Sequence, residues 1–456
     1  MDIVSEKLAA FITSTEWANL PEQVVDGVKY LLLDSIGCGI AGVTTDPGKM
    51  IISLARRLGG PPEASIIGEG SKVSCVNAAL ANGQLINLID YEALSGHTPP
   101  YIIPPPLAMA ETTGASGKEL ILATALGLET THRIAAALSR GTFFAGNKDG
   151  KYTWATRSGY ASSNFGAAAA AGKIINLSQD QMINCLGIAG HATQVLTWIR
   201  YTFQDHRAMT KYGFPGWQNT GGVMAALLAQ TGFIGDVTVF DNEEGFWKFA
   251  GYENWNPAKI LDDLGEKWNY FDRIQYKWYP CCRMFQTELD CFYKILEDNQ
   301  LRPEEIEAVN IFGHPTLEAP AFTNRELNSV VDIQFGPAYI FAMAAHDIPK
   351  GVDWQDLELA RSPKIHGFAD KVTYQAHPEF GTKMTSMVEV NARGTTFREE
   401  KKFIDVHQPT SEELIAKFRH NAARILTEPQ INNAVDTILG LEQVDNISEL
   451  TKQITI

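Results

Sequence analysis

The chain is organised around one stretch, Ile86-Asn87-Leu88-Ile89-Asp90-Tyr91-Glu92-Ala93-Leu94-Ser95-Gly96-His97-Thr98-Pro99-Pro100. It ends an apolar, helix-like segment and leads through three further prolines into a second helix, residues 107–112. The prolines after His97 restrict the backbone and keep the loop from continuing as a helix. An imidazole on a stiffened loop, close to Asp90 and Glu92, suits proton transfer near neutral pH. The alternative is a polar turn between two core helices with an incidental histidine.

Length and charge restrict the class of protein. The chain has 456 residues, of which 45% are hydrophobic and 20% charged, enough for two or three domains with a sizeable core. The net charge of −15 disfavours nucleic acid or an anionic membrane as the main partner. A small anionic substrate remains compatible, because a local basic pocket can lie inside an acidic protein.

Cysteine usage and the N-terminus indicate a cytoplasmic enzyme in a reducing environment. Six cysteines in a chain of this length do not make a disulfide framework, and no CxxC pair predicts a zinc site. Residues 1–7 lack the basic and apolar pattern of a signal peptide. The alanine-rich run at 166–173 is too short to span a bilayer.

Helical spacing of apolar residues dominates the first part of the chain. It predicts helices over residues 3–12, 22–42, 47–59, 77–88, 117–140 and 165–174. Residues 65–68 suggest a short strand. Residues 142–164 are polar, aromatic and interrupted by glycines, which is typical of a long loop.

The pattern changes to strands after residue 272. Alternating residues predict strands at 273–279, 307–313, 371–374 and 386–390, the last followed by the tight turn Asn391-Ala392-Arg393-Gly394. From Thr410 onward the pattern is helical again. We therefore predict a mainly α protein with a large all-helical domain, residues 1–267 with 403–456, and a smaller inserted α+β lid domain, residues 268–402.

Two further stretches carry chemistry. Lys211 lies just before the helix that Pro215 opens, where an ammonium, free amides and the helix dipole can converge on a carboxylate. Lys277 and Arg283 flank an aromatic-proline-cysteine turn at the predicted domain junction, which suggests anion binding in a cleft. The alternatives are a solvated lysine and ordinary core packing. Cys281 is not favoured as a nucleophile, since no local Cys-His signature accompanies it.

These stretches, taken together, resemble the MmgE/PrpD family over nearly the whole chain. The resemblance rests on their order and spacing rather than on any one of them. They are Leu20–Val25, Leu31–Cys38, His97 to Ala108, Gly114–Leu120, Lys211–Trp217, Gly232–Gly235, Lys277–Arg283 and Pro409–Leu414.

The resemblance implies a fold, a site and a chemistry. The implied fold is a helical domain with an α+β lid, commonly a homodimer, with the active site between the domains. His97, Asp90, Lys211 and Lys277 match the family's catalytic positions. The implied chemistry handles a carbanion or enol beside a carboxylate without a cofactor: the lysines hold carboxylates and the histidine moves a proton. The sequence contains no metal-ligand cluster and no phosphate-binding glycine motif, so we expect no metal or organic cofactor.

The sequence also departs from the family. Phe214 stands where a histidine is common, which would make one wall of the site apolar. A second histidine is usual near residues 154–160, where Arg157 or Tyr160 is the nearest substitute. Arg157, a permanent charge, would favour a more anionic substrate. With Arg283, these residues form the predicted substrate-binding set.

Three functional hypotheses follow. The first is a lyase that dehydrates or decarboxylates a small di- or tricarboxylate. The second is an epimerase or isomerase of a dicarboxylate that removes and returns a proton. The third is a catalytically silent relative, against which the retained His97, Lys211 and Lys277 argue.

Overall fold

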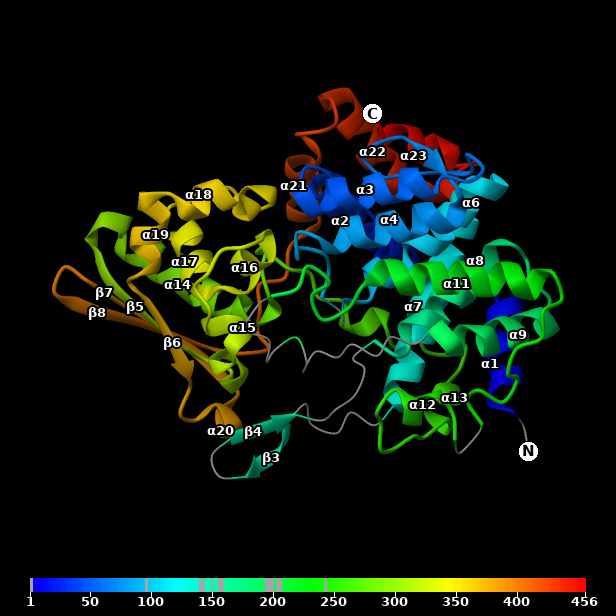
Figure 1. Cartoon of the computed structure of the whole chain (residues 1–456), viewed down its shortest axis with the longest axis horizontal. Coiled ribbons are helices and arrows are strands. Elements are labelled where there is room, and N and C mark those ends of the chain that lie inside the picture. Colours follow the sequence, from blue (N-terminus) through cyan, green and yellow to red (C-terminus); the bar gives the residue numbers. More distant parts are fainter. Residues whose placement is uncertain are drawn as a thin grey trace.

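A computed structural model of the chain describes residues 3–94, 97–138, 144–148, 151–154, 160–192, 201, 207–241 and 244–456. Helices dominate these residues, and a single four-stranded sheet lies at one end of the molecule (Figure 1). The prediction of a mainly α protein is confirmed. Within the described residues, the helices include none that is long and apolar enough to cross a membrane.

The helical part follows the start signals in the sequence. Ser116 and Glu119 form a reciprocal cap on the first turn of one long helix, and Thr45 accepts a hydrogen bond from Gly48 at another. The helices are α1 Val4–Ser14, α2 Glu22–Val43, α3 Asp46–Leu58, α4 Cys75–Asn87, α5 Pro99–Ile102, α6 Pro104–Thr113, α7 Gly117–Ala137, α8 Ser163–Ile174, α9 Gln179–Ala189, α11 Pro215–Gln230, α12 Phe246–Phe249 and α13 Ala258–Leu261. A two-stranded ribbon, β1 Ala64–Ser65 with β2 Lys72–Val73, precedes α4.

The sheet has the order β6-β5-β7-β8. Strand β5 (Ile306–Gly313) pairs in parallel with β6 (Val372–Ala376) and antiparallel with β7 (Thr385–Ala392), which continues through a tight turn into β8 (Thr395–Lys402). Helices α14 (Gln286–Asn299) and α17 (Pro337–Ala345) belong to the same apolar core as the inward side chains of β5 and β7. Shorter helices complete this part: α15 Pro320–Thr323, α16 Val330–Phe335, α18 Leu357–Arg361, α19 Pro363–Ala369 and α20 Phe380–Lys383.

The molecule has two large apolar cores and one small one, and the C-terminal helices belong to the core of the helical part. Helices α21 (Ser411–Ala422), α22 (Glu428–Leu439) and α23 (Ser448–Gln453) pack with the helical part (Figure 1). Helix α21 lies against α2 so closely that a Cβ on Gly37 would be 3.0 Å from the ring of Phe418. The domain boundaries at residues 267 and 403 stay a prediction.

Two sequence expectations were wrong. Residues 273–279 form no strand. Arg273 ends a 3-10 turn, and the amides of Trp278 and Tyr279 donate to the side-chain oxygen of Gln286, both at 3.1 Å, instead of to a neighbouring strand. The segment 142–164 is not all loop: it contains the hairpin β3 Phe144–Lys148 with β4 Lys151–Trp154. Asp149-Gly150, a dipeptide that favours tight hairpin turns, was the overlooked signal.

Close packing of α4 against α11 places the ends of both helices at one point. A Cβ on Gly83 would lie 2.8 Å from the carbonyl oxygen of Pro100, so a larger residue at position 83 would push these two segments apart. Asn219 of α11 donates to the carbonyls of Ala79 and Pro100 at 3.2 and 2.9 Å. The loop after α4 and the loop before α11 therefore meet.

Candidate active site

One buried carboxylate joins two buried ammonium groups at this meeting point. Asp90 Oδ1 lies 3.0 Å from Lys211 Nζ, and Asp90 Oδ2 lies 2.6 Å from Lys277 Nζ. All three side chains are fully buried. Lys211 also donates to the carbonyl of Asn87 at 2.5 Å, and Lys277 to the carbonyl of Asp90 at 2.8 Å. Three of the four predicted catalytic residues are thus in direct contact.

Each of these residues lies in a different connecting segment. Asp90 follows α4, Lys211 precedes α11, and Lys277 lies between the two parts of the chain. Nine described non-glycine residues have positive φ, and Asp90, His97 and Lys211 are three of them, at 54°, 54° and 52°. Left-handed backbone is costly for most side chains and clusters at functional sites. The loop conformation at this point is therefore maintained by tertiary contacts.

The two lysines keep Asp90 ionised. Burial by itself would raise the pKa of Asp90, but the positive charges of Lys211 and Lys277 outweigh burial and hold the pKa well below its ordinary value. Burial lowers the pKa of Lys277, but Asp90 and Glu92 raise it beyond that loss, so this lysine is also charged. A charged pair in such surroundings persists only with good geometry and further hydrogen bonds, both of which are present here.

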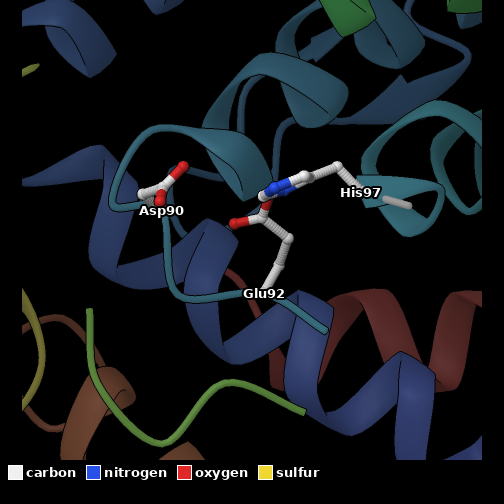
Figure 2. Close-up of side chains that lie close together, drawn as sticks. All are labelled: Asp90, Glu92 and His97. Carbon is white, nitrogen blue, oxygen red and sulfur yellow. The ribbon is translucent and has the colours of Figure 1, made fainter. Parts of the chain in front are cut away.

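His97 lies beside this ion cluster, against the second carboxylate. Its Nδ1 is 3.0 Å from Glu92 Oε1, and Asn87 Nδ2 donates to the same oxygen at 2.8 Å. Figure 2 shows the carboxylate of Glu92 next to the imidazole, with Asp90 beyond it. Burial and the charge of Lys277 lower the pKa of His97, against the opposing effect of Glu92. The imidazole is therefore neutral at pH 7, with 13% of its side chain exposed.

Tyr212 connects the histidine to the ion cluster. Its hydroxyl is 3.0 Å from His97 Nε2 and 3.1 Å from His97 Nδ1, and it donates to Asp90 Oδ1 at 3.2 Å. The ring of Tyr160 stacks on Tyr212 at 5.7 Å and on Tyr101 at 4.9 Å. Burial raises the pKa of Tyr160 and of Tyr212 well above the ordinary value, so both hydroxyls keep their protons. Tyr160, a predicted substrate-binding residue, is thus next to the site.

The other predicted substrate-binding residues have different surroundings. Arg283 donates to the carbonyl of Phe403 at 2.8 Å and stacks on its ring. Phe214 precedes α11 and packs on Trp217, with ring centroids 5.5 Å apart. Arg157 lies outside the described residues. The contacts described for Arg283 and Phe214 do not join either of them to the Asp90 cluster.

Sequence reasoning missed a second buried ion pair that supports the site. Lys417 of α21 lies 2.6 Å from Asp34 Oδ1 of α2 and donates to the carbonyls of Tyr91 and Lys277 at 2.7 and 3.0 Å. One ammonium therefore joins the backbones on which Asp90 and Lys277 lie. Asp34 was detectable, since a carboxylate on the apolar face of a helix is rarely buried without a partner. Tyr212 was missed although it directly follows Lys211.

Charge argues against a cation at this point. One oxygen each from Asp90 and Glu92 and one ring nitrogen of His97 lie within 4.8 Å of one another, a donor set that a divalent metal can use. Both oxygens of Asp90, however, already face ammonium groups, and a cation there would be repelled by both. The arrangement suits proton transfer beside an anion better than metal binding.

Two hollows described in the structure lie elsewhere. One, of about 320 Å³, is lined by residues that include His132, Lys259 and Asp262, and another, of about 200 Å³, lies beside β6 around Tyr339. Charges of both signs line the first, and neither contains a residue of the Asp90 cluster. The Asp90 cluster and these two hollows are therefore separate features of the structure.

Comparison with known proteins identifies the family of the chain. The MmgE/PrpD N-terminal domain matches residues 6–257 and the MmgE/PrpD C-terminal domain residues 279–441. A cis-aconitate decarboxylase of Aspergillus terreus is 25% identical over 485 residues, covering 98% of this chain and 95% of the relative. The human cis-aconitate decarboxylase is 22% identical over 473 residues, covering 98% and 94%. These two alignments cover nearly the whole chain, whereas the two family models leave out residues 258–278, where Lys277 lies.

Proposed function

This chain belongs to the MmgE/PrpD family, and from that premise we propose that it is a lyase acting on a small di- or tricarboxylate, by decarboxylation or dehydration. The observation that supports this most is the pair of buried ammonium groups beside a neutral histidine. Loss of CO₂ or of a proton next to a carboxylate leaves electrons on carbon, and positive charge stabilises that state. The names of the relatives point the same way.

The proposed roles follow from the contacts. His97 moves the proton, since it is the titratable group of the cluster that reaches solvent and is neutral at pH 7. Lys211 and Lys277 hold the substrate's carboxylates. An ammonium has three N–H donors, and among the described residues each lysine shows two bonds, so one donor on each remains for a ligand. Asp90 holds both lysines in place, and Tyr160 with Tyr212 forms an aromatic wall.

A deuterium experiment tests the proposed function. The enzyme is incubated with cis-aconitate and with a panel of other di- and tricarboxylates in deuterated water, and the mixture is followed by NMR. A lyase gives a product that has lost CO₂ or water, whereas an epimerase gives only deuterium exchange and inversion. No change with any acid of the panel would contradict the proposal. Activity is expected to survive EDTA, because the proposed chemistry uses only protein groups.

The pH dependence of kcat/KM reports the protonation state that His97 needs. Because burial and Lys277 lower the pKa of His97, we expect one inflection below pH 6.5. If His97 acts first as a base, kcat/KM rises with pH through this inflection and is flat above it. If it acts first as an acid, kcat/KM falls with rising pH instead. The first result fits proton removal and the second fits protonation of a carbanion; an inflection only above pH 7 would contradict the assignment to His97.

We also propose a homodimer formed through α3 and α11. Met50, Leu54 and Leu58 recur every four residues on α3 and are 57%, 40% and 54% exposed, while Trp217 and Met224 on α11 are 60% and 47% exposed. Both helices pack against α4 (Figure 1). An exposed apolar patch of this kind is typical of an interface.

Leu54→Glu should disrupt this dimer. A carboxylate in the centre of an apolar interface is desolvated without a partner, so the mass from size-exclusion chromatography with light scattering should fall towards that of one chain. Ile404→Glu is the matched control, since Ile404 is 60% exposed and follows β8, away from both helices. A dimeric Leu54→Glu protein, or a monomeric wild type, would refute this interface.

A further inference from the structure

Glu92 has a contact that the proposed catalytic set does not explain. Its Oε1 receives both Asn87 Nδ2, at 2.8 Å, and His97 Nδ1, at 3.0 Å. The side chain is fully buried, and Oε2 finds no hydrogen-bond partner among the described residues. A carboxylate placed so tightly against an imidazole does more than fill space, because the hydrogen bond at one ring nitrogen decides the state of the other.

The protonation state of Glu92 settles the direction of that hydrogen bond. Burial by itself would raise the pKa of Glu92. The hydrogen bond from His97 and the charge of Lys277 outweigh burial and lower this pKa below its ordinary value, so the group is ionised at pH 7. An ionised carboxylate only accepts hydrogen bonds. The hydrogen between Glu92 and His97 must therefore lie on Nδ1 of the imidazole.

We propose that Glu92 is a positioning residue that fixes the Nδ1–H tautomer of His97 and leaves Nε2 as the atom that takes up or releases the proton. This inference rests on the proposed function for its catalytic meaning, although the tautomer itself is independent of it. The transfer balances simply: a proton bound to Nε2 makes an imidazolium, whose Nδ1–H still donates to Glu92. When Nε2 releases the proton, the neutral Nδ1–H tautomer returns.

Tyr212 lies beside both ring nitrogens, with its hydroxyl 3.0 Å from Nε2 and 3.1 Å from Nδ1 of His97. Its hydroxyl hydrogen is directed to Asp90 Oδ1 at 3.2 Å, so its oxygen can accept a hydrogen bond from a protonated Nε2, 3.0 Å away. The charged groups that act on His97 are Glu92 and Asp90 from its own loop and Lys277 from the segment before α14. The two carboxylates favour the imidazolium and Lys277 opposes it, so removing the charge of Glu92 should favour the neutral ring.

Histidine-selective ¹⁵N labelling of the full-length protein tests the tautomer directly. Long-range ¹H–¹⁵N spectra distinguish a protonated ring nitrogen from an unprotonated one, and His97→Gln identifies the signal among the ten histidines of the chain. At pH 8 we expect Nδ1 of His97 to be protonated and Nε2 unprotonated. An Nε2–H tautomer, or an even mixture of the two, in the wild-type protein would overturn the inference.

Two substitutions separate the charge of Glu92 from its hydrogen bond. Glu92→Gln can keep an acceptor at Oε1, so the tautomer should persist while the kcat/KM inflection moves by about one pH unit or more to lower pH. Glu92→Ala removes the acceptor as well and should give a mixture of tautomers, with kcat reduced and KM nearly unchanged. An unmoved inflection in Glu92→Gln, or an unchanged tautomer in Glu92→Ala, contradicts the proposed role.

Glu111→Gln is the matched control. Glu111 is also a buried carboxylate, but it accepts from Ser65 and Thr451 and pairs with Lys72 rather than with His97. Its loss should leave both the tautomer and the inflection unchanged. The spectra also separate this inference from the proposed function. An Nδ1–H tautomer that disappears in Glu92→Ala supports the positioning role even if His97→Ala keeps its activity, which would sink only the catalytic assignment.

Discussion

His97→Ala is expected to lower kcat by about 10²–10⁴-fold, the usual contribution of a positioned acid–base group. The imidazole is held between Glu92 and Tyr212, and no other group of the cluster can replace it: Asp90 is kept ionised by two lysines, and burial holds the proton on Tyr212. The measurement is steady-state kinetics with the substrate found in the deuterium experiment. KM should change little, since the carboxylates are held by the lysines.

His420→Ala is the control for removing a histidine. Its side chain is 41% exposed and pairs with Asp353, away from the cluster, so its loss should leave kcat and KM near their wild-type values. Lys277→Ala provides the contrast: removing a carboxylate-binding group should raise KM, and lower kcat as well where the ammonium stabilises transition-state charge. Near-normal kinetics for His97→Ala would contradict the assignment of proton transfer to this residue.

Asp90→Ala is expected to destabilise the fold by about 3–5 kcal/mol, because it leaves two buried ammonium groups without an anionic partner. Asp90 contacts both Lys211 and Lys277, and all three side chains are fully buried, so water cannot take the place of the carboxylate without opening the site. The measurement is urea unfolding followed by circular dichroism. Asp90→Asn keeps the shape of the side chain and part of its hydrogen bonding, so it should lower the free energy of unfolding by less than Asp90→Ala.

Asp263→Ala is the matched control for an aspartate paired with a lysine. Asp263 and Lys267 are 47% and 62% exposed, and an exposed pair of this kind contributes little to stability. If Asp90→Ala and Asp263→Ala change stability by similar amounts, the Asp90 cluster does not hold the two parts of the chain together. A soluble but unfolded Asp90→Ala protein would also agree with the prediction, because the loss of stability would then exceed the stability of the fold.

Much of the fold could be predicted from local pattern. The spacing of Val24, Val28, Leu31 and Leu32 predicted α2, Pro215 marked the first turn of α11, and the turn at Asn391–Gly394 predicted the β7–β8 hairpin, all of which the structure contains. Such features depend on residues only a few positions apart. The same reasoning failed at 273–279, which contains a buried lysine and where the side chain of Gln286 accepts hydrogen bonds from two backbone amides.

The sequence by itself determined which residues could carry the chemistry: His97 beside two carboxylates, and Lys211 and Lys277 on loops next to aromatic and proline residues. Only the tertiary structure decided their pairing. Asp90 is 121 residues from Lys211 and 187 from Lys277, and Lys417 reaches the Tyr91 carbonyl across 326 residues. The strength of a charge pair depends on distance and burial, neither of which periodicity contains. The contact between the end of α4 and the start of α11 therefore decides that Lys211 is part of a buried ion pair and not a solvated surface group.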